Sequence, residues 1–322
     1  MSYTLFALNK INSYMKIATR EAFGEALAEL GKTHKDIVVL DADLSGSTKT
    51  NLFAKAFPDR FFNMGIAEQD MIGTAAGLAV AGKNVFAASF AVFIVGRAYD
   101  QIRNTVAYSH LNVKIVGSHA GILTGEDGAT HQMLEDLSLM RGLPDMLVLC
   151  PSDSIETKQI VEFLADYEGP AYLRLGRAGV HVLHNDSYHF QLGKGDILRE
   201  GKNICIIATG TCVSHSLMAA EKLESEKISA QVINIASIKP FDNKMIEKLG
   251  QEFSHIFTIE DHSIYGGLGS ATAEVLAETG SKSKLHRIGM TTFGESGTPD
   301  DLYEKYGLDS DGIFNKILQI IR

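Results

Sequence analysis

The sequence predicts an α/β protein built from two consecutive doubly wound domains, and three observations support this fold class. Short apolar runs rich in Val and Ile alternate with longer segments of helical periodicity, a pattern typical of parallel sheets covered by helices. A polar, irregular stretch after Arg177 separates two such alternating sets. The length of 322 residues suits two domains of ordinary size, whereas a single domain would be unusually large. We therefore expect one domain over residues 1–190 and a second over residues 191–322.

In the first domain, apolar runs predict the strands, and the periodic segments between them predict the helices. The expected strands are 37–40, 84–89, 113–116, 146–150 and 171–174. The expected helices are 18–30, 68–81, 97–108, 132–141 and 154–167. Ser152 and Asp153 precede the last of these helices, and both residue types are frequent helix caps.

The second domain shows the same alternation. Its expected strands are 204–209, 230–235, 255–260 and 285–288. Its expected helices are 213–224, 243–249 and 269–278. Strands that alternate with helices in this way again indicate a parallel sheet, because parallel strands need long crossover connections.

The overall composition narrows the classes of function. The chain is 45% hydrophobic and 21% charged, which is typical of a folded globular protein. The formal net charge of -9 argues against a nucleic-acid-binding surface, because binding to a phosphate backbone needs clustered Lys and Arg. Any phosphate recognition by this chain is therefore expected to be local.

Cys150, Cys205 and Cys212 form no CxxC pair and have no histidines at ligand spacing. We therefore expect no structural zinc, three small buried side chains and a reducing compartment.

Residues 1–16 lack the basic start and apolar segment of a signal peptide, and no stretch reaches the roughly 18 apolar residues of a membrane span. The sequence thus predicts a cytoplasmic protein without a membrane segment.

Glu68 stands at the start of an expected helix and has apolar neighbours. Gly65, Ile66 and Ala67 precede it, and the helix that follows is too apolar to be freely solvated. A glutamate at a helix start commonly interacts with the helix dipole. A carboxyl buried in an apolar setting instead has a raised pKa and can serve a cofactor or an acid–base reaction. The immediate surroundings support both interpretations about equally.

The segment from Phe61 to Ala81, FFNMGIAEQDMIGTAAGLAVA, resembles the glutamate-bearing segment of the transketolase superfamily. This superfamily also includes 1-deoxyxylulose-5-phosphate synthases and the beta subunits of 2-oxoacid dehydrogenases. The resemblance implies that the first domain binds the pyrimidine of thiamine diphosphate and that Glu68 activates this coenzyme. It also implies a second domain of the transketolase C-terminal type, with similar segments at 235–242, 260–262 and 266–269. For the glycine-rich segment 266–269 we expect close backbone packing and no catalytic role.

Phe90 and Phe93 follow an expected strand, at the edge where ligands of doubly wound sheets bind. As an isolated pair they would fit ordinary core packing. Their place in the family pattern implies that at least one of them stacks on the coenzyme pyrimidine. Gly96 stands where transketolases commonly have another pocket aromatic, so this wall is either open or filled by another side chain.

The segments 117–122 and 125–132 resemble the substrate loop of transketolases. The match implies that His131 contacts oxygen atoms of the sugar donor, that Asp127 contacts a substrate hydroxyl, and that His119 lies near the phosphate end. His119 and His131 are also expected to assist proton transfers. They join Glu68 as the catalytic candidates.

Arg20, Ser47 and Arg177 match the positions that bind the substrate phosphate in transketolases. Two guanidiniums, a hydroxyl and the His119 imidazole suit a terminal phosphate monoester, because paired arginines provide both charge and hydrogen-bonding geometry. Each residue alone would also fit a plain surface role. Their joint match favours a phosphate clamp, and the resemblance places Asp43 beside the coenzyme in an orienting role.

The 322 residues contain no Gly-Asp-Gly motif, which the superfamily uses with a later Asn to bind the coenzyme diphosphate and its Mg²⁺. The resemblance therefore covers only the C-terminal half of a full-length transketolase. It implies an N-terminal partner subunit that carries the diphosphate domain and the Mg²⁺ or Ca²⁺, whereas this chain is expected to contribute no metal ligand. Because the family forms each site between two halves, the expected assembly is an α2β2 heterotetramer.

The resulting hypothesis is the C-terminal subunit of a split transketolase, which moves a two-carbon ketol unit from a ketose phosphate to an aldose phosphate. One enzymatic alternative is the beta subunit of a 2-oxoacid dehydrogenase, which has no need of a sugar-phosphate clamp. Another is half of a 1-deoxyxylulose-5-phosphate synthase, which residues 97–101 resemble. A catalytically silent binding or regulatory module is the non-enzymatic alternative. Both the pentose phosphate pathway and a specialised sugar route would suit these residues.

Overall fold

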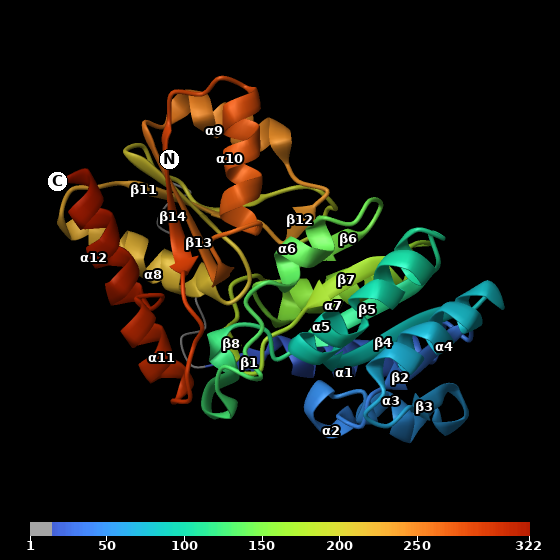
Figure 1. Ribbon diagram of the computed structural model, residues 1–322. Helices are drawn as coiled ribbons and strands as arrows, with labels where there is room; N and C mark the ends of the chain where they lie inside the picture. The colour runs from blue at the N-terminus through green and yellow to red at the C-terminus, as the bar shows by residue number, and fades with distance from the viewer. Residues whose placement is uncertain (1–14) are drawn as a thin grey trace.

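The computed structural model describes residues 15–322 and contains two large sheets, each covered by helices (Figure 1). The seven-stranded sheet has the order β12-β6-β7-β5-β4-β2-β3, and the five-stranded sheet has the order β14-β13-β10-β11-β9. Within these two sheets the strands pair in parallel except β12 with β6 and β9 with β11. The predicted α/β fold class is confirmed.

The central strands of the first sheet are buried along their whole length, in keeping with their nearly continuous apolar sequences. The sheet consists of β2 (Ile37–Asp41), β3 (Phe61–Asn63), β4 (Asn84–Phe90), β5 (Val113–Ser118), β6 (Leu147–Leu149), β7 (Ala171–Arg174) and β12 (Ser237–Lys239). Its α-helices are α1 (Thr19–Leu30), α2 (Ser45–Thr48), α3 (Asn51–Ala56), α4 (Glu68–Val80), α5 (Ala91–Gln101), α6 (Asp136–Arg141) and α7 (Ser154–Asp166). Shorter helical segments are η2 (Pro58–Arg60), the π-helix η3 (Ile102–Ala107) and the 3₁₀ helix η4 (Ile122–Asp127).

The second sheet lies in the C-terminal half of the chain. It consists of β9 (Asp196–Arg199), β10 (Ile204–Ala208), β11 (Ala230–Asn234), β13 (His255–Ser263) and β14 (Lys284–Met290). Its helices are α8 (Cys212–Ser225), α9 (Asn243–Glu252), α10 (Leu268–Glu278), α11 (Pro299–Tyr306) and α12 (Ser310–Ile321). A separate pair, β1 (Lys16–Ala18) and β8 (Gly179–His181), is antiparallel.

Several element boundaries differ from those expected. The helix expected over 97–108 begins already at Ala91, as α5, and continues as η3. Residues 91–95 include β-branched and aromatic side chains of modest helix propensity, which hides the helical pattern there. The helix expected over 132–141 begins only at Asp136, because turns closed by hydrogen bonds to the Gly128 carbonyl precede it. Helices α11 and α12 and the edge strands β3, β9 and β12 were not predicted.

Strand β12 joins the two halves of the molecule. It belongs to the second half of the sequence but pairs with β6 of the first sheet, with Ser237 opposite Leu149 (Figure 1). Lys239 Nζ donates to the carbonyl of Arg141 at 3.1 Å. One apolar cluster runs through both halves and includes Val148 and Ile235. The two halves therefore share a core.

Two further expectations concern cysteines and membrane segments. Cys150, Cys205 and Cys212 are all free and buried, as predicted. From Met15 to the C-terminus, no helix combines the length and the apolar content that a bilayer span needs. The expectation about a signal peptide lies almost wholly outside the described residues.

His184 lies in the segment that connects the two halves and contacts a residue of each half. Its Nδ1 lies 3.0 Å from Asp153 Oδ2 at the start of α7, and its Nε2 lies 3.4 Å from Asp196 Oδ2 in β9. Burial alone would lower the pKa of His184, but the hydrogen bond with Asp153 and the nearby carboxylate of Asp196 raise it to about 10. His184 is therefore a buried cation at neutral pH.

Replacing His184 by Gln is expected to destabilise the chain by about 3–5 kcal/mol at pH 6, because Asp153 stays buried without its cation. The folded-state pKa of His184 lies above its unfolded value of about 6.5. Its contribution is therefore complete below about pH 6.5 and is lost as the pH rises through about 10. Urea unfolding of both proteins should give a free-energy difference that shrinks between pH 6 and pH 10. A constant difference would contradict a charged His184.

Candidate active site

Six of the predicted site residues lie at or after the carboxyl ends of four neighbouring parallel strands, β7, β5, β4 and β2. In this order the residues are Arg177, His119, Phe90 with Phe93, and Asp43 with Ser47. The carboxyl ends of parallel strands meet at one edge of a sheet, and ligands of doubly wound sheets bind there. The topology therefore lines these side chains up along one edge.

Glu68 is the first residue of α4 and is 4% exposed. Gly65, with φ of +70°, turns the chain ahead of the helix, in a conformation that L side chains rarely adopt. Arg97 Nη1 donates to Glu68 Oε1 at 2.8 Å, and within residues 15–322 the other carboxylate oxygen accepts no hydrogen bond. A buried carboxyl with one oxygen available suits a cofactor ring nitrogen that needs a hydrogen-bond partner. The surroundings of Glu68 thus fit the pyrimidine of thiamine diphosphate.

Four rings pack together at the same edge. Phe90 and Phe93 stack with ring centroids 5.7 Å apart. His119 stacks on Phe90 at 3.8 Å, and His131 meets Phe93 edge-on at 5.3 Å. The structure therefore brings the predicted coenzyme aromatics and the predicted substrate histidines into one ring cluster. Phe93 is the more accessible of the two phenylalanines, since Phe90 is 6% exposed and buried.

Arg97 is a site residue that was not predicted from the sequence. Its guanidinium lies 4.0 Å from the centroid of Phe93, within cation–π range, and it also donates to Glu68. The four-residue spacing from Phe93 to Arg97 places both on one helix face and could have revealed this contact. The signal was lost because the helix was expected to begin only at residue 97. Gly96 is exposed, and a Cβ atom there would meet nothing within 4 Å, so no neighbouring side chain fills the space beside it.

His119 is a buried imidazole held by its neighbours. It is 2% exposed, its φ is +56°, and its Nδ1 lies 2.9 Å from Ser118 Oγ. Thr124 Oγ1 donates to the His119 carbonyl at 2.7 Å. Burial, together with the positive charges of Arg20 and Arg177, lowers the pKa of His119 to about 3. The ring is therefore neutral in the physiological range and can donate through one nitrogen and accept through the other.

The neutral state of His119 can be tested by NMR. Because its pKa lies near 3, the imidazole nitrogen shifts of His119 should stay constant between pH 5 and pH 8. The measurement is a long-range ¹H–¹⁵N correlation on imidazole-labelled protein, with the His119 signal assigned from His119→Gln. A titration midpoint between pH 5 and pH 8 would contradict a buried, neutral ring close to the charges of Arg20 and Arg177.

The predicted phosphate residues also come together. Arg20 Nη1 donates to the Ser47 carbonyl at 2.7 Å, and Arg20 Nε donates to the Arg177 carbonyl at 3.3 Å. This placement follows from the pairing of β1, just before α1, with β8, just after Arg177. Burial and the charge of Arg177 lower the pKa of Arg20, although Glu21 opposes them. Two cations and the short helix α2, which carries Ser47, thus meet beside His119.

Arg177 already contacts oxygen atoms of residues 119–132, the segment that carries both histidines. Its Nη1 donates to the carbonyl of Thr124 and to Glu126 Oε2, the latter at 2.8 Å. No role was predicted for Glu126, although this residue lies within the motif that resembles the substrate loop. The guanidinium is thus oriented towards acceptor oxygens, as a phosphate site requires.

Asp127 and Asp43 lie in more exposed positions. Asp127 ends η4 and is exposed. Asp43 has φ of +62° and accepts a hydrogen bond from Asn63 Nδ2 at 2.9 Å. The hydrogen bonds of residues 15–322 connect neither aspartate to the ring cluster or to the two arginines. Their roles towards substrate and coenzyme stay predictions.

Metal ligands were not expected in this chain. In the described part of the sequence, no three His, Cys, Asp or Glu side chains gather as a metal site would require. The side chains that the structure brings together at this edge are a buried carboxyl, two imidazoles, two phenyl rings and guanidiniums.

Comparison with known proteins assigns both halves of the chain. The family described as the pyrimidine binding domain of transketolase matches residues 15–181, and the transketolase C-terminal domain matches residues 193–313. A Methanocaldococcus jannaschii protein that carries the name of a transketolase C-terminal section is 51% identical over 303 residues, which cover 93% of this chain and 95% of the relative.

Two further relatives come from split systems by name. A Phocaeicola vulgatus protein, named as one of the subunits of an apulose-4-phosphate transketolase, is 40% identical over 308 residues, which cover 95% of this chain and 98% of the relative. A solved structure described as a split gene transketolase, inactive beta4 tetramer, is 47% identical with a TM-score of 0.85. That match covers 95% of this chain and 98% of the other.

Proposed function

Because this chain belongs to the transketolase family, we propose that it is the C-terminal subunit of a split transketolase. The reaction would transfer a two-carbon ketol unit from a ketose phosphate to an aldose phosphate. One observation carries the proposal: a buried carboxyl and a two-arginine clamp occupy the same sheet edge and are linked by the ring cluster. A sugar bound between the coenzyme and the phosphate site requires such an unbroken row of side chains, because its reacting atoms must be held in a fixed position.

Glu68, Phe90 and Phe93 would hold the pyrimidine of thiamine diphosphate. When bound, this coenzyme supplies the nucleophilic carbon that attacks the donor carbonyl. Glu68 would hold a proton at the pyrimidine ring nitrogen through its available oxygen. Phe93 would pack against the ring face, and Arg97 would keep Glu68 and Phe93 in place.

The sugar and its phosphate would lie beyond the rings. His131 and His119 would bind sugar oxygens and assist proton transfers, and the neutral His119 can both donate and accept. Asp127 would contact a hydroxyl group of the sugar. Arg20, Ser47 and Arg177 would bind the terminal phosphate. The relative named for apulose-4-phosphate supports a phosphorylated ketose as the class of substrate.

The proposal includes a partner chain. The relatives named as a single transketolase subunit and as a split-gene transketolase support an N-terminal partner. That partner would contribute the Gly-Asp-Gly domain, which binds the diphosphate and the Mg²⁺ or Ca²⁺. We propose an α2β2 assembly with two sites, each formed between the two kinds of chain.

The test is reconstitution. The chain is produced alone and with an N-terminal transketolase subunit from the same genome, and ketol transfer between sugar phosphates is measured with and without thiamine diphosphate and Mg²⁺. We expect activity only when both chains and both cofactors are present. Full activity of the chain alone would disprove the need for a partner.

An assay with pyruvate separates the enzymatic alternatives. It is needed because residues 97–101 resemble a 1-deoxyxylulose-5-phosphate synthase and Arg97 contacts Glu68. The same complexes are assayed for decarboxylation of pyruvate, with and without an aldose phosphate acceptor. A transketolase should cleave ketose phosphates and leave pyruvate unchanged. Pyruvate turnover without ketose cleavage would instead indicate a 2-oxoacid dehydrogenase or a 1-deoxyxylulose-5-phosphate synthase.

A further inference from the structure

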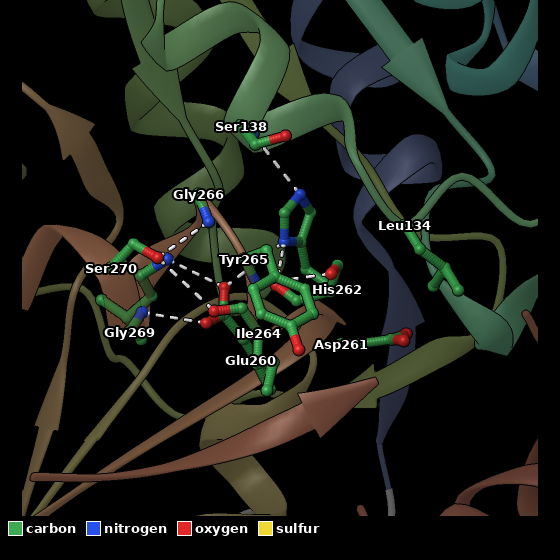
Figure 2. A network of polar contacts seen from close by, with 12 residues as sticks. Leu134, Ser138, Glu260, Asp261, His262, Ile264, Tyr265, Gly266, Gly269 and Ser270 are labelled. Atoms are coloured by element: carbon green, nitrogen blue, oxygen red, sulfur yellow. Dashed lines mark hydrogen bonds and ion pairs between the residues drawn. The ribbon is translucent and has the colours of Figure 1, made fainter. Parts of the chain in front are cut away.

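The segment Glu260-Asp261-His262 lies near the end of strand β13 in the second half of the chain, and its successive side chains point in opposite directions. Glu260 and His262 face α10 and α6, whereas Asp261 points away from both, as Figure 2 shows. This alternation is the normal geometry of a strand. The side chains of this segment therefore contact different parts of the molecule on the two sides of the strand. On the side of Asp261 the neighbour is residues 119–132, here called the substrate loop.

Asp261 holds the beginning of that loop. Its Oδ1 accepts the backbone N–H of Ile122 at 2.9 Å, and the carboxyl is 2% exposed. A Cβ atom at Gly121, whose φ is +80°, would lie only 2.1 Å from Asp261 Oδ2. Only a glycine therefore lets the loop backbone approach the carboxylate this closely. Arg174 Nη2 fixes Asp261 in turn by donating to its carbonyl at 2.7 Å.

A second contact from the C-terminal half holds the end of the loop. Gln132 is 3% exposed, and its Nε2 donates to the carbonyls of Gly125 at 3.2 Å and Glu295 at 2.9 Å. Glu295 belongs to the segment before α11. The amide thus joins the loop to the second half of the chain independently of Asp261.

The loop that these two contacts hold also carries several candidate site residues. The loop carries His119, Glu126, Asp127 and His131, while Asp261 and Glu295 carry none of the proposed chemistry. A loop of this length needs outside partners for its backbone groups, since buried amides are almost always hydrogen-bonded. Several backbone N–H groups of this loop bond within the first half of the chain, whereas that of Ile122 bonds to Asp261 of the second half.

We propose that Asp261 is a positioning residue, which sets the substrate loop so that His119 and His131 meet the sugar. The C-terminal half thereby acts on substrate binding in addition to its packing role. This inference rests on the proposed transketolase function. Gln132 acts in the same way from the other end of the loop.

Glu260 offers a matched control. It is the neighbouring residue on β13 and is fully buried, but its carboxylate accepts the N–H groups of Leu268 at 2.8 Å and Gly269 at 2.9 Å (Figure 2). It therefore caps α10 and makes no hydrogen bond to the substrate loop. A substitution there should cost stability without moving the loop.

The first measurement needs neither a partner nor activity. Hydrogen–deuterium exchange of the full-length chain is compared among the wild type, Asp261→Ala, Asp261→Asn and Glu260→Gln. In Asp261→Ala, amides 121–125 should exchange at least about tenfold faster, with the strands of both sheets unchanged. Asp261→Asn keeps an acceptor oxygen and should restore most of the protection. Unchanged exchange at 121–125 in Asp261→Ala would overturn the proposal.

The second measurement is kinetic and uses the reconstituted complex. Asp261→Ala should lower kcat/KM for the phosphorylated ketose by roughly 10- to 100-fold, mainly through KM, because a small misplacement of binding groups has effects of this size. Asp261→Asn should recover to within about threefold of wild type. Gln132→Glu, which removes the donor, should repeat the loss and provides a second test if Asp261→Ala folds poorly.

The outcomes separate the two proposals. If the wild-type complex shows no ketol transfer, the proposed function fails, while the exchange experiment still reports on the loop. If exchange changes but KM does not, Asp261 is only structural and the positioning role is wrong. An equal loss of kcat/KM in Glu260→Gln would also overturn it, because general destabilisation would then explain the kinetics.

Discussion

Glu68→Gln is expected to lower kcat for ketol transfer in the reconstituted complex by about 10²–10⁴-fold, the range over which positioned acid–base groups act. Glu68 is 4% exposed and has one carboxylate oxygen that is not engaged by Arg97. Glutamine keeps the shape and an acceptor oxygen but cannot hold the proton at the pyrimidine nitrogen. The loss should therefore appear in kcat, with a smaller change in KM for the sugar.

Asp70→Asn is the matched control for this substitution. Asp70 lies in the same first turn of α4 but is exposed, so both changes remove one negative charge near the helix N-terminus. Asp70→Asn should keep kcat within about threefold of wild type, and urea unfolding should show that both variants are folded. Activity of Glu68→Gln within tenfold of wild type would contradict the role of Glu68.

Arg20→Ala and Arg177→Ala are each expected to raise KM for a phosphorylated ketose by roughly 30-fold, and together by roughly 1000-fold. A hydrogen bond to a charged group contributes about 1.5–3 kcal/mol, and about 2 kcal/mol corresponds to this factor. The two guanidiniums converge beside Ser47 and His119, so a phosphate there would meet both charges. A ketose without the phosphate should show nearly the same KM in wild type and variants.

The control for the clamp is Arg322→Ala. Arg322 is an exposed arginine at the end of the chain, paired with Glu226, and its loss should leave both KM values unchanged. Arg20 also donates to two backbone carbonyls, so unfolding curves are needed to separate lost binding from lost stability. Equal KM increases for the phosphorylated and unphosphorylated ketose would contradict a phosphate clamp.

Much of the fold could be predicted because its signals are local. Buried parallel strands such as β4 and β5 need continuous apolar runs, and crossover helices need a 3.6-residue period. The expected helix over 68–81 corresponds closely to α4, and Glu68 begins it as expected. Elements with weak local signals were missed: β12 has only three residues, and α5 begins in a run of β-branched and aromatic side chains.

The amino-acid sequence was sufficient to identify which residues stand at the ends of the parallel strands. Glu68, Phe93, His119 and Arg177 could be selected because their contiguous motifs resemble those of the transketolase superfamily and each follows or opens a recognisable element. The strand order then necessarily places such residues at one edge. Their roles with coenzyme and sugar remain predictions that the substitutions above test.

The contacts between side chains across that edge, in contrast, depend on how the folded chain packs. The Arg97–Glu68 pair joins residues 29 positions apart, and the Asp261–Ile122 hydrogen bond joins residues 139 positions apart. A local pattern records burial and periodicity, but it does not say which distant carboxylate will accept a given backbone N–H group. That choice is made when the two halves pack into a shared core and each buried polar group must find its partner.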